Sequence, residues 1–215
     1  ASMIYETVIK FNPDNLEIEP LIADDFEITD SNKTFTFNIR KGIFFHDNKC
    51  FPDGKGRELT PADVKYSYEF YCTPIEGLFS VAYHTVFTNN VVGIEDFVSG
   101  KSNDISGITI DGDKVIIKLT HSNSDFLKQL ATTSASIIPK EAIEKGTIED
   151  GVGTGPFILQ SNTSSVITYA KNPKYYLNDK KGNKLPYLDS VVFTIIPSKI
   201  DQLISFEEGE IDFID

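Results

Sequence analysis

The side chains in this sequence that could take part in catalysis include three histidines, two cysteines and the adjacent carboxylates Asp24-Asp25 and Glu207-Glu208. His46 directly precedes Asp47, so the two could act as a general base with its orienting acid. No serine or cysteine in the chain stands in a recognisable nucleophile motif. We therefore expect His46 to be a surface or capping residue and expect no catalytic residues. A hydrolase that uses His46 or a carboxylate pair is the competing hypothesis.

Templates for bound metals fit this sequence poorly. The three histidines are widely separated and lack the spacing of metal ligands. In the acidic loop of residues 47–58, Lys49 and Phe51 stand where calcium requires oxygen ligands. We expect neither a metal nor another cofactor.

The glycine-rich segment from Gly151 to Gly155 looks at first like a phosphate-binding loop. Such a loop follows a strand and opens a helix, so that the helix N-terminus faces the anion. Here a strand-like run from Pro156 to Leu159 follows, and the lysine of a phosphate loop is missing. We predict a tight structural turn instead.

The composition is that of an ordinary globular protein. Of its residues, 40% are hydrophobic and 24% charged. The length of 215 residues is enough for one large domain or two small ones. The net charge of −12 and the scattered basic residues argue against nucleic acid as a partner. No apolar run reaches the ~20 residues of a membrane span, and the first six residues do not resemble a signal peptide. We expect a soluble chain or a processed piece of a longer protein.

Two cysteines, Cys50 and Cys72, lie 22 positions apart. In an oxidising compartment they could close a loop with one disulfide, worth roughly 3 kcal/mol on the loop-entropy model. Two separately buried thiols are the alternative, and the residues alone leave both open.

The aromatic residues are numerous, with 16 phenylalanines, nine tyrosines and no tryptophan. Most of these rings must belong to the core. Tyr5, Tyr83, Tyr175 and Tyr176 lie at segment edges, where an amphipathic ring can face a cleft. On composition alone we expect each of them to be structural.

Periodicity and turn residues predict interspersed hairpins and helices. Residues 34–39 alternate at period two, which indicates a half-buried strand. Thr60 and Pro61 are typical of a helix start, with Thr60 as the N-cap. An Asp-Gly turn joins two strands within residues 107–119. The other expected strands are 157–160, 165–170, 191–196 and 211–215, and the other expected helices are one opening at Ser124, one at 139–145 and one at 200–206.

The strand expected at residues 191–196 is nearly unbroken in its apolar character, which is typical of a strand buried on both faces of a sheet. The order of the elements indicates an α/β protein in the broad, mixed α+β sense. A mixed sheet fits this order better than a doubly wound one.

Eight short segments occur in the same order as the motifs of a known family. They are Met3 to Val8, Pro20 to Glu27, Lys33 to Asp47, Thr60 to Ser67, Gly153 to Phe157, Asn172 to Tyr176, Pro186 to Asp189 and Gly209 to Asp212. No single segment is specific, but the ordered set resembles extracytoplasmic solute-binding protein family 5. This family comprises the oligopeptide-, dipeptide- and nickel-binding proteins of ABC importers.

The resemblance implies part of a two-lobed fold of the periplasmic-binding-protein type II kind, with mixed sheets and flanking helices. Residues 1–18 and 121–215 would form an incomplete first lobe, and residues 19–120 a small extra domain. The second lobe, which closes over the ligand by a hinge motion, would be absent from this chain.

The implied function is ligand binding without chemistry. The protein would be the substrate-binding component of a peptide importer, capturing oligopeptides or dipeptides and delivering them to the membrane permease. It would work in the periplasm or at the cell surface, in some members through a lipid anchor. The same scaffold could instead bind a nickel chelate, haem or a sugar, or act as an extracellular receptor.

Three positions carry over from the family as ligand-binding candidates. Glu6 matches a cleft acid of the peptide binders, Tyr83 falls in a region that supplies a cleft tyrosine, and Tyr176 lies in a segment near the cleft. The extracytoplasmic location also favours a disulfide between Cys50 and Cys72. The loop of residues 47–58, which carries Cys50, is longer than the usual family turn.

Overall fold

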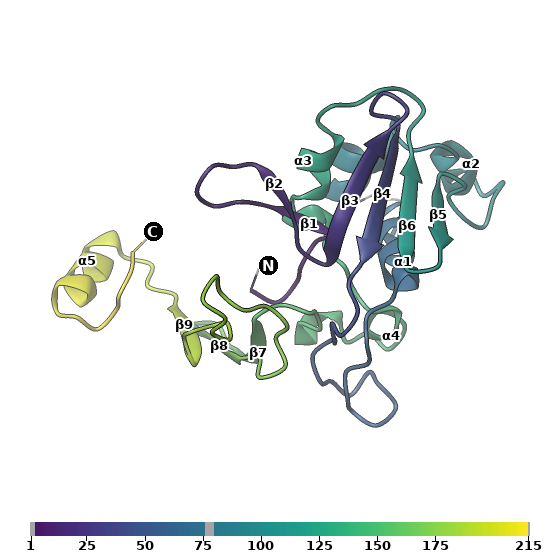
Figure 1. Cartoon of the computed structure of the whole chain (residues 1–215). Coiled ribbons are helices and arrows are strands. Elements are labelled where there is room, and N and C mark those ends of the chain that lie inside the picture. Colours follow the sequence, from purple (N-terminus) through teal and green to yellow (C-terminus); the bar gives the residue numbers. More distant parts are fainter. Residues whose placement is uncertain (1–2, 76–79, 215) are drawn as a thin grey trace.

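The largest sheet of the computed structural model, which describes residues 3–75 and 80–214, has four antiparallel strands in the order β3-β4-β6-β5 (Figure 1). The strands are β3 (Ala23–Thr29), β4 (Thr34–Ile39), β5 (Ile108–Asp111) and β6 (Lys114–Lys118). Alternation along β4 buries Phe35 and Phe37, which pair in register with Ile117 and Val115 of β6. The strand predicted over residues 34–39 and the hairpin within residues 107–119 are therefore confirmed.

Helix α1 (Pro61–Tyr71) begins where the sequence predicts. The backbone N–H of Thr60 donates to Asp63 Oδ2 at 2.8 Å, which satisfies one of the free N–H groups at the helix start. Pro61 occupies the first turn, where its missing N–H costs nothing. The helix packs against β5 and β6, and its Val64 and Tyr68 are fully buried.

The hydroxyl of Tyr68 is buried without a hydrogen-bond partner among the described residues. Because such a group loses its water without compensation, it costs about 1–3 kcal/mol. We expect Tyr68→Phe to raise the free energy of unfolding by about 1 kcal/mol in urea denaturation. The control is Tyr71→Phe, which removes a hydroxyl that donates to Ser136 O at 2.6 Å and should lower that energy instead. Destabilisation by both changes would contradict the assignment.

Shorter elements surround the large sheet. They are β1 (Ile9–Phe11), β2 (Ile18–Pro20), the π-helical turn η1 (Tyr83–Phe87), α2 (Ile94–Val98), α3 (Phe126–Leu130), η2 (Thr133–Ala135), α4 (Lys140–Glu144) and η3 (Ile148–Asp150). Strands β1 and β2 form a hairpin beside β3 (Figure 1). The helix expected to open at Ser124 starts later, with Asp125 as its N-cap. The helix expected at residues 139–145 is confirmed as α4, and Gly146 follows it with a positive φ of 63°.

A second antiparallel sheet contains β7 (Phe157–Asn162), β8 (Val166–Lys171) and β9 (Ser190–Thr194), and α5 (Lys199–Glu207) follows it. The predicted strands and the final helix are thus present. In Figure 1, α5 lies at the far end of the molecule from the four-stranded sheet. No helix within the described ranges is long and apolar enough to cross a bilayer.

The prediction that β9 is buried on both faces of its sheet is wrong. Val192 and Phe193 are 55% and 46% exposed, because β9 is the edge strand of a three-stranded sheet and pairs with β8 alone. The strand expected at residues 211–215 is also wrong for residues 211–214, which have no regular structure. Asp215 lies outside the described residues.

One hydrophobic core extends through most of the chain. It includes Val8 and Ile9 near the start, the inner face of the large sheet, and Phe126, Leu130 and Ala142 from the later helices. Residues on both sides of the boundaries expected at residues 18 and 120 therefore belong to the same core. The division into an extra domain and a lobe stays a prediction.

The long loop of residues 47–58 is fastened to later parts of the chain by ion pairs. Arg57 binds two carboxylates at once, Asp63 at the start of α1 and Glu141 in α4, with its closest contacts at 2.6 and 2.7 Å. Lys174 Nζ lies 2.7 Å from Asp47 Oδ1. The Arg57–Glu141 and Lys174–Asp47 contacts join segments that lie more than 80 residues apart in the sequence.

Cys50 and Cys72 are free thiols, and both are completely buried. Burial raises the pKa of Cys72 to about 12, so its thiol stays protonated and unreactive. The disulfide that the family resemblance implied is therefore not formed in this structure. The structure instead has two separately buried thiols, because each cysteine packs within the hydrophobic core.

Candidate functional site

Glu6, in the segment before β1, is buried with only 4% of its surface exposed. Its carboxylate accepts three hydroxyl hydrogen bonds. Tyr175 OH and Tyr176 OH donate to Oε1 at 2.8 and 3.3 Å, and Thr154 Oγ1 donates to Oε2 at 2.9 Å. We call Glu6, Thr154, Tyr175 and Tyr176 the Glu6 cluster.

Burial raises the pKa of the Glu6 carboxyl to about 7 from its usual 4.5, because loss of water disfavours the charged form. The three hydroxyl donors and the charge of Lys10 oppose this effect without overcoming it. Burial and the neighbouring carboxylate in turn raise the pKa values of Tyr175 and Tyr176. The Glu6 carboxylate would therefore gain from any added positive charge or N–H donor.

A turn of closely packed glycines places Thr154 against Glu6. The N–H of Gly155 donates to Ile4 O at 2.8 Å, so the turn lies directly against the segment that carries Glu6. A Cβ at position 153 would lie 2.1 Å from Ile4 O. The tight turn predicted over residues 151–155 is confirmed, and glycine is needed at Gly153 because two backbones meet there.

We expect Gly153→Ala to lower the free energy of unfolding by about 3 kcal/mol, because the added methyl group can be accommodated only by moving one of these backbones. The control is Gly182→Ala, where a Cβ meets nothing within 4 Å and only the positive φ of 85° is unfavourable. That control should cost about 1 kcal/mol. Chemical denaturation of both variants measures the difference, and equal losses would contradict the proposed contact.

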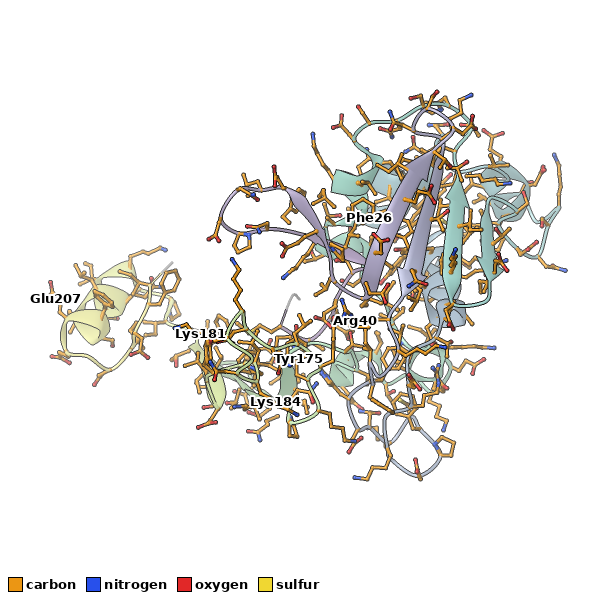
Figure 2. All side chains as sticks on the ribbon, viewed as in Figure 1. Phe26, Arg40, Tyr175, Lys181, Lys184 and Glu207 are labelled. Atoms are coloured by element: carbon orange, nitrogen blue, oxygen red, sulfur yellow. The ribbon has the colours of Figure 1, made fainter. Side chains whose placement is uncertain are left out.

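Tyr175 and Tyr176 are presented by a turn that follows β8. Asn172 begins this turn, since its Oδ1 accepts from Lys174 N at 2.9 Å and its carbonyl accepts from Tyr175 N at 3.2 Å. The guanidinium of Arg40 lies 5.9 Å from the centre of the Tyr176 ring, within cation–π range. Figure 2 shows Arg40 at the end of β4, beside the segment that carries Tyr175.

A half-open pocket of about 220 Å³ lies beside the cluster. Glu6 and Tyr175 contribute to its wall, together with Lys10, which pairs with Glu19 at 3.0 Å. Its other lining residues are Tyr5, Thr7, Leu21, Ala131, Thr133, Ser136 and Pro156. Because Glu19 neutralises Lys10, this mixture of apolar surface, hydroxyls and one buried carboxylate suits a ligand with ammonium or amide N–H groups.

A larger pocket, of about 390 Å³, lies between the loop of residues 47–58 and β7. Two of its three acids, Asp47 and Asp150, are already paired, with Lys174 at 2.7 Å and Lys49 at 3.2 Å. We favour the smaller pocket because its buried carboxylate has hydroxyl donors but no bound cation.

The structure brings together two of the three predicted ligand-binding residues, Glu6 and Tyr176. Tyr83 lies in η1, where it packs partly buried against the core, with its ring 5.1 Å from that of His84. It is not among the described residues that line the pocket beside Glu6.

Sequence reasoning missed Thr154 and treated Tyr175 as structural. The sequence did contain a signal for Thr154, which lies between Gly153 and Gly155. Because both glycines pack against another backbone segment, the hydroxyl between them is held in a fixed place. Tyr175 precedes Tyr176 in the same turn, and neither pattern nor composition distinguishes the two rings.

His46 is 3% exposed, so the expected surface location is wrong. Its Nε2 lies 2.9 Å from Gly155 O, and burial lowers the pKa of its imidazole. The ring therefore supports the glycine turn from inside. Within residues 3–75 and 80–214, no three histidine, cysteine, aspartate or glutamate side chains gather as a metal site would require.

Comparison with known proteins gives consistent matches along the chain. The model of the family described as bacterial extracellular solute-binding proteins, family 5 Middle, matches residues 17–215. The dipeptide-binding protein of Escherichia coli strain K12 is 29% identical over 96% of this chain and 38% of its own length. The heme-binding protein A of Haemophilus influenzae is 26% identical over 100% of this chain and also 38% of its own length.

Solved structures agree with these matches. The periplasmic binding protein DppA from Helicobacter pylori, in complex with the peptide STSA, has a TM-score of 0.76 at 27% identity, over 97% of this chain and 40% of that one. A periplasmic oligopeptide-binding protein from Borrelia burgdorferi has a TM-score of 0.81 at 24% identity, over 98% and 41%, and supports the fold alone. This chain therefore spans about two fifths of the length of the proteins that it matches.

Proposed function

Since this chain belongs to family 5 of the bacterial extracellular solute-binding proteins, we propose that its protein captures peptides outside the cytoplasm as the binding component of an ABC importer. It hands them to a membrane permease and catalyses no reaction. On this proposal residues 19–120 are the extra domain and residues 1–18 and 121–215 belong to the first lobe. A second lobe would lie in sequence beyond the two fifths matched here.

The observation that carries the proposal is the Glu6 cluster. Its carboxylate is buried and oriented by three hydroxyls, yet it has no bound cation among the described residues and lies on a half-open pocket. An α-ammonium group or a backbone N–H of a peptide would supply the missing positive charge or donor. We propose Glu6 and Tyr176 as ligand-binding residues, and Tyr83 as a more distant contact from η1.

Haem is the second candidate ligand, because the heme-binding protein A of Haemophilus influenzae matches the whole chain at 26% identity. A porphyrin ligand would need a broad apolar slot, whereas the pocket beside Glu6 holds about 220 Å³ and contains a carboxylate and several hydroxyls. These features favour a peptide.

Native mass spectrometry of the full-length gene product, purified without refolding, tests the proposal. Denaturing release should yield a series of peptide masses. Release of a single porphyrin mass, with a Soret absorption band in the purified protein, would replace peptide by haem. Turnover of peptides that is lost in His46→Ala would instead support the hydrolase hypothesis.

A further inference from the structure

Two buried side chains donate to one backbone carbonyl beside the Glu6 cluster. His46 Nε2 and Asn172 Nδ2 each lie 2.9 Å from Gly155 O. Because a carbonyl only accepts hydrogen bonds, both nitrogens carry hydrogen. This carbonyl belongs to the residue directly after Thr154, so the two donors hold the turn from which Thr154 reaches Glu6.

Asn172 also organises the segment that carries the two tyrosines. Its N–H donates to Pro156 O at 2.8 Å, its Oδ1 accepts from Lys174 N at 2.9 Å, and its carbonyl accepts from Tyr175 N at 3.2 Å. The residue is 4% exposed. It therefore uses its whole side chain and its backbone to tie the glycine turn to the tyrosine turn.

We propose that Asn172 is the positioning residue of the Glu6 cluster: it sets the spacing between Thr154 on one turn and Tyr175 and Tyr176 on another. It acts on a ligand only through these residues. The assignment of a ligand rests on the proposed function, whereas the effect on Glu6 does not.

The geometry makes this role necessary. Thr154 and Tyr175 lie on two different loops: Ile4 and His46 hold the first of them, and Asn172 links it to the second. The three hydroxyl hydrogens must converge on two oxygens of one carboxylate. Hydrogen bonds tolerate errors of only a few tenths of an ångström in the distance between donor and acceptor. One amide that donates to the first loop and accepts from the second removes the relative motion.

The test replaces Asn172 with alanine in the full-length gene product. The matched control is Asn90→Ala, since Asn90 also donates to a backbone carbonyl, Val86 O at 2.8 Å, and accepts from an amide, Asn123 Nδ2 at 3.1 Å. Both partners of Asn90 lie outside the segments that carry the cluster. Carboxyl ¹³C NMR follows the Glu6 signal, identified by its loss in Glu6→Gln, in protein freed of ligand.

We expect Asn172→Ala to raise the pKa of the Glu6 carboxyl by about 1, because misplaced hydroxyls no longer stabilise its charged form. Affinity for the probe peptide trialanine at pH 7, measured by calorimetry, should fall about tenfold. Asn90→Ala should change neither quantity. If Asn172→Ala folds poorly, Asn172→Ser is used, which keeps an oxygen for Lys174 N but cannot reach Gly155 O, and the same rise in pKa is expected.

An unchanged Glu6 pKa in the Asn172 variants would overturn the positioning role, whatever their stability. Failure of the wild-type protein to bind trialanine or to release any peptide, together with a raised Glu6 pKa in the variants, would overturn the proposed function and leave the positioning role intact.

Discussion

Replacing Arg57 with methionine should lower the free energy of unfolding by about 3 kcal/mol. The guanidinium of Arg57 satisfies Asp63, whose side chain is only 5% exposed, and Glu141 in α4. Methionine preserves much of the packing but leaves the Asp63 carboxylate buried without its cation. The loss is large because the two hydrogen bonds from Thr60 then compensate the desolvation of Asp63 only in part.

The control is Lys55→Met, which removes a lysine that is 69% exposed and lies 3.1 Å from Asp47. Water replaces an exposed pair easily, so this change should cost less than about 1 kcal/mol. Arg57→Lys should fall between the two, because one ammonium group cannot make bidentate bonds to two carboxylates. Urea denaturation measures all three variants. A loss below about 1 kcal/mol in Arg57→Met would show that the ion pairs of Arg57 are structurally dispensable.

Replacing Glu6 with glutamine should have opposite effects on stability and on binding. The folded-state pKa of Glu6, about 7, lies above its usual 4.5, so the folded protein keeps a proton that the unfolded chain loses. The stability from this proton is fully present below pH 4.5 and is lost as pH rises through 7. At pH 8 the charge burial costs roughly 3 kcal/mol, and Glu6→Gln should recover about 2 kcal/mol of it.

Peptide binding should weaken at least 30-fold in Glu6→Gln at pH 8, because a neutral amide leaves the bound cationic group unpaired. The control Glu144→Gln removes the same charge from an exposed pair with Lys140, outside this pocket, and should affect binding and stability little. Denaturation at pH 5 and pH 8, with calorimetry at pH 8, separates the two effects. A Glu6→Gln protein that binds peptide normally and is less stable at both pH values would refute a ligand role for Glu6.

Features set by neighbouring residues were predictable from the sequence. Thr60, Pro61 and Asp63 determine the start of α1 among themselves, and the alternation of residues 34–39 determines which side chains of β4 face the core. The glycine turn at 151–155 was predictable as a turn, because no helix could follow it. Each of these depends on interactions within a few residues.

Features that depend on distant contacts were not predictable in this way. Whether β9 is buried depends on which elements cover it, and its own apolar residues cannot reveal that. His46 is buried because Gly155, 109 positions later, accepts its hydrogen bond. Glu6 could be proposed only through the family resemblance, since its three donors come from residues 148 or more positions away.

The edge strand β9 also bears on how this polypeptide behaves in concentrated solution. Among the described residues no strand pairs with its outer side, and Val192, Phe193 and Ile195 beside it are 46–55% exposed. Strands of this kind pair readily with copies of themselves, and natural proteins normally cover or charge them. Residues 1–215 on their own should therefore self-associate through β9, and their solubility will depend on how this edge is shielded.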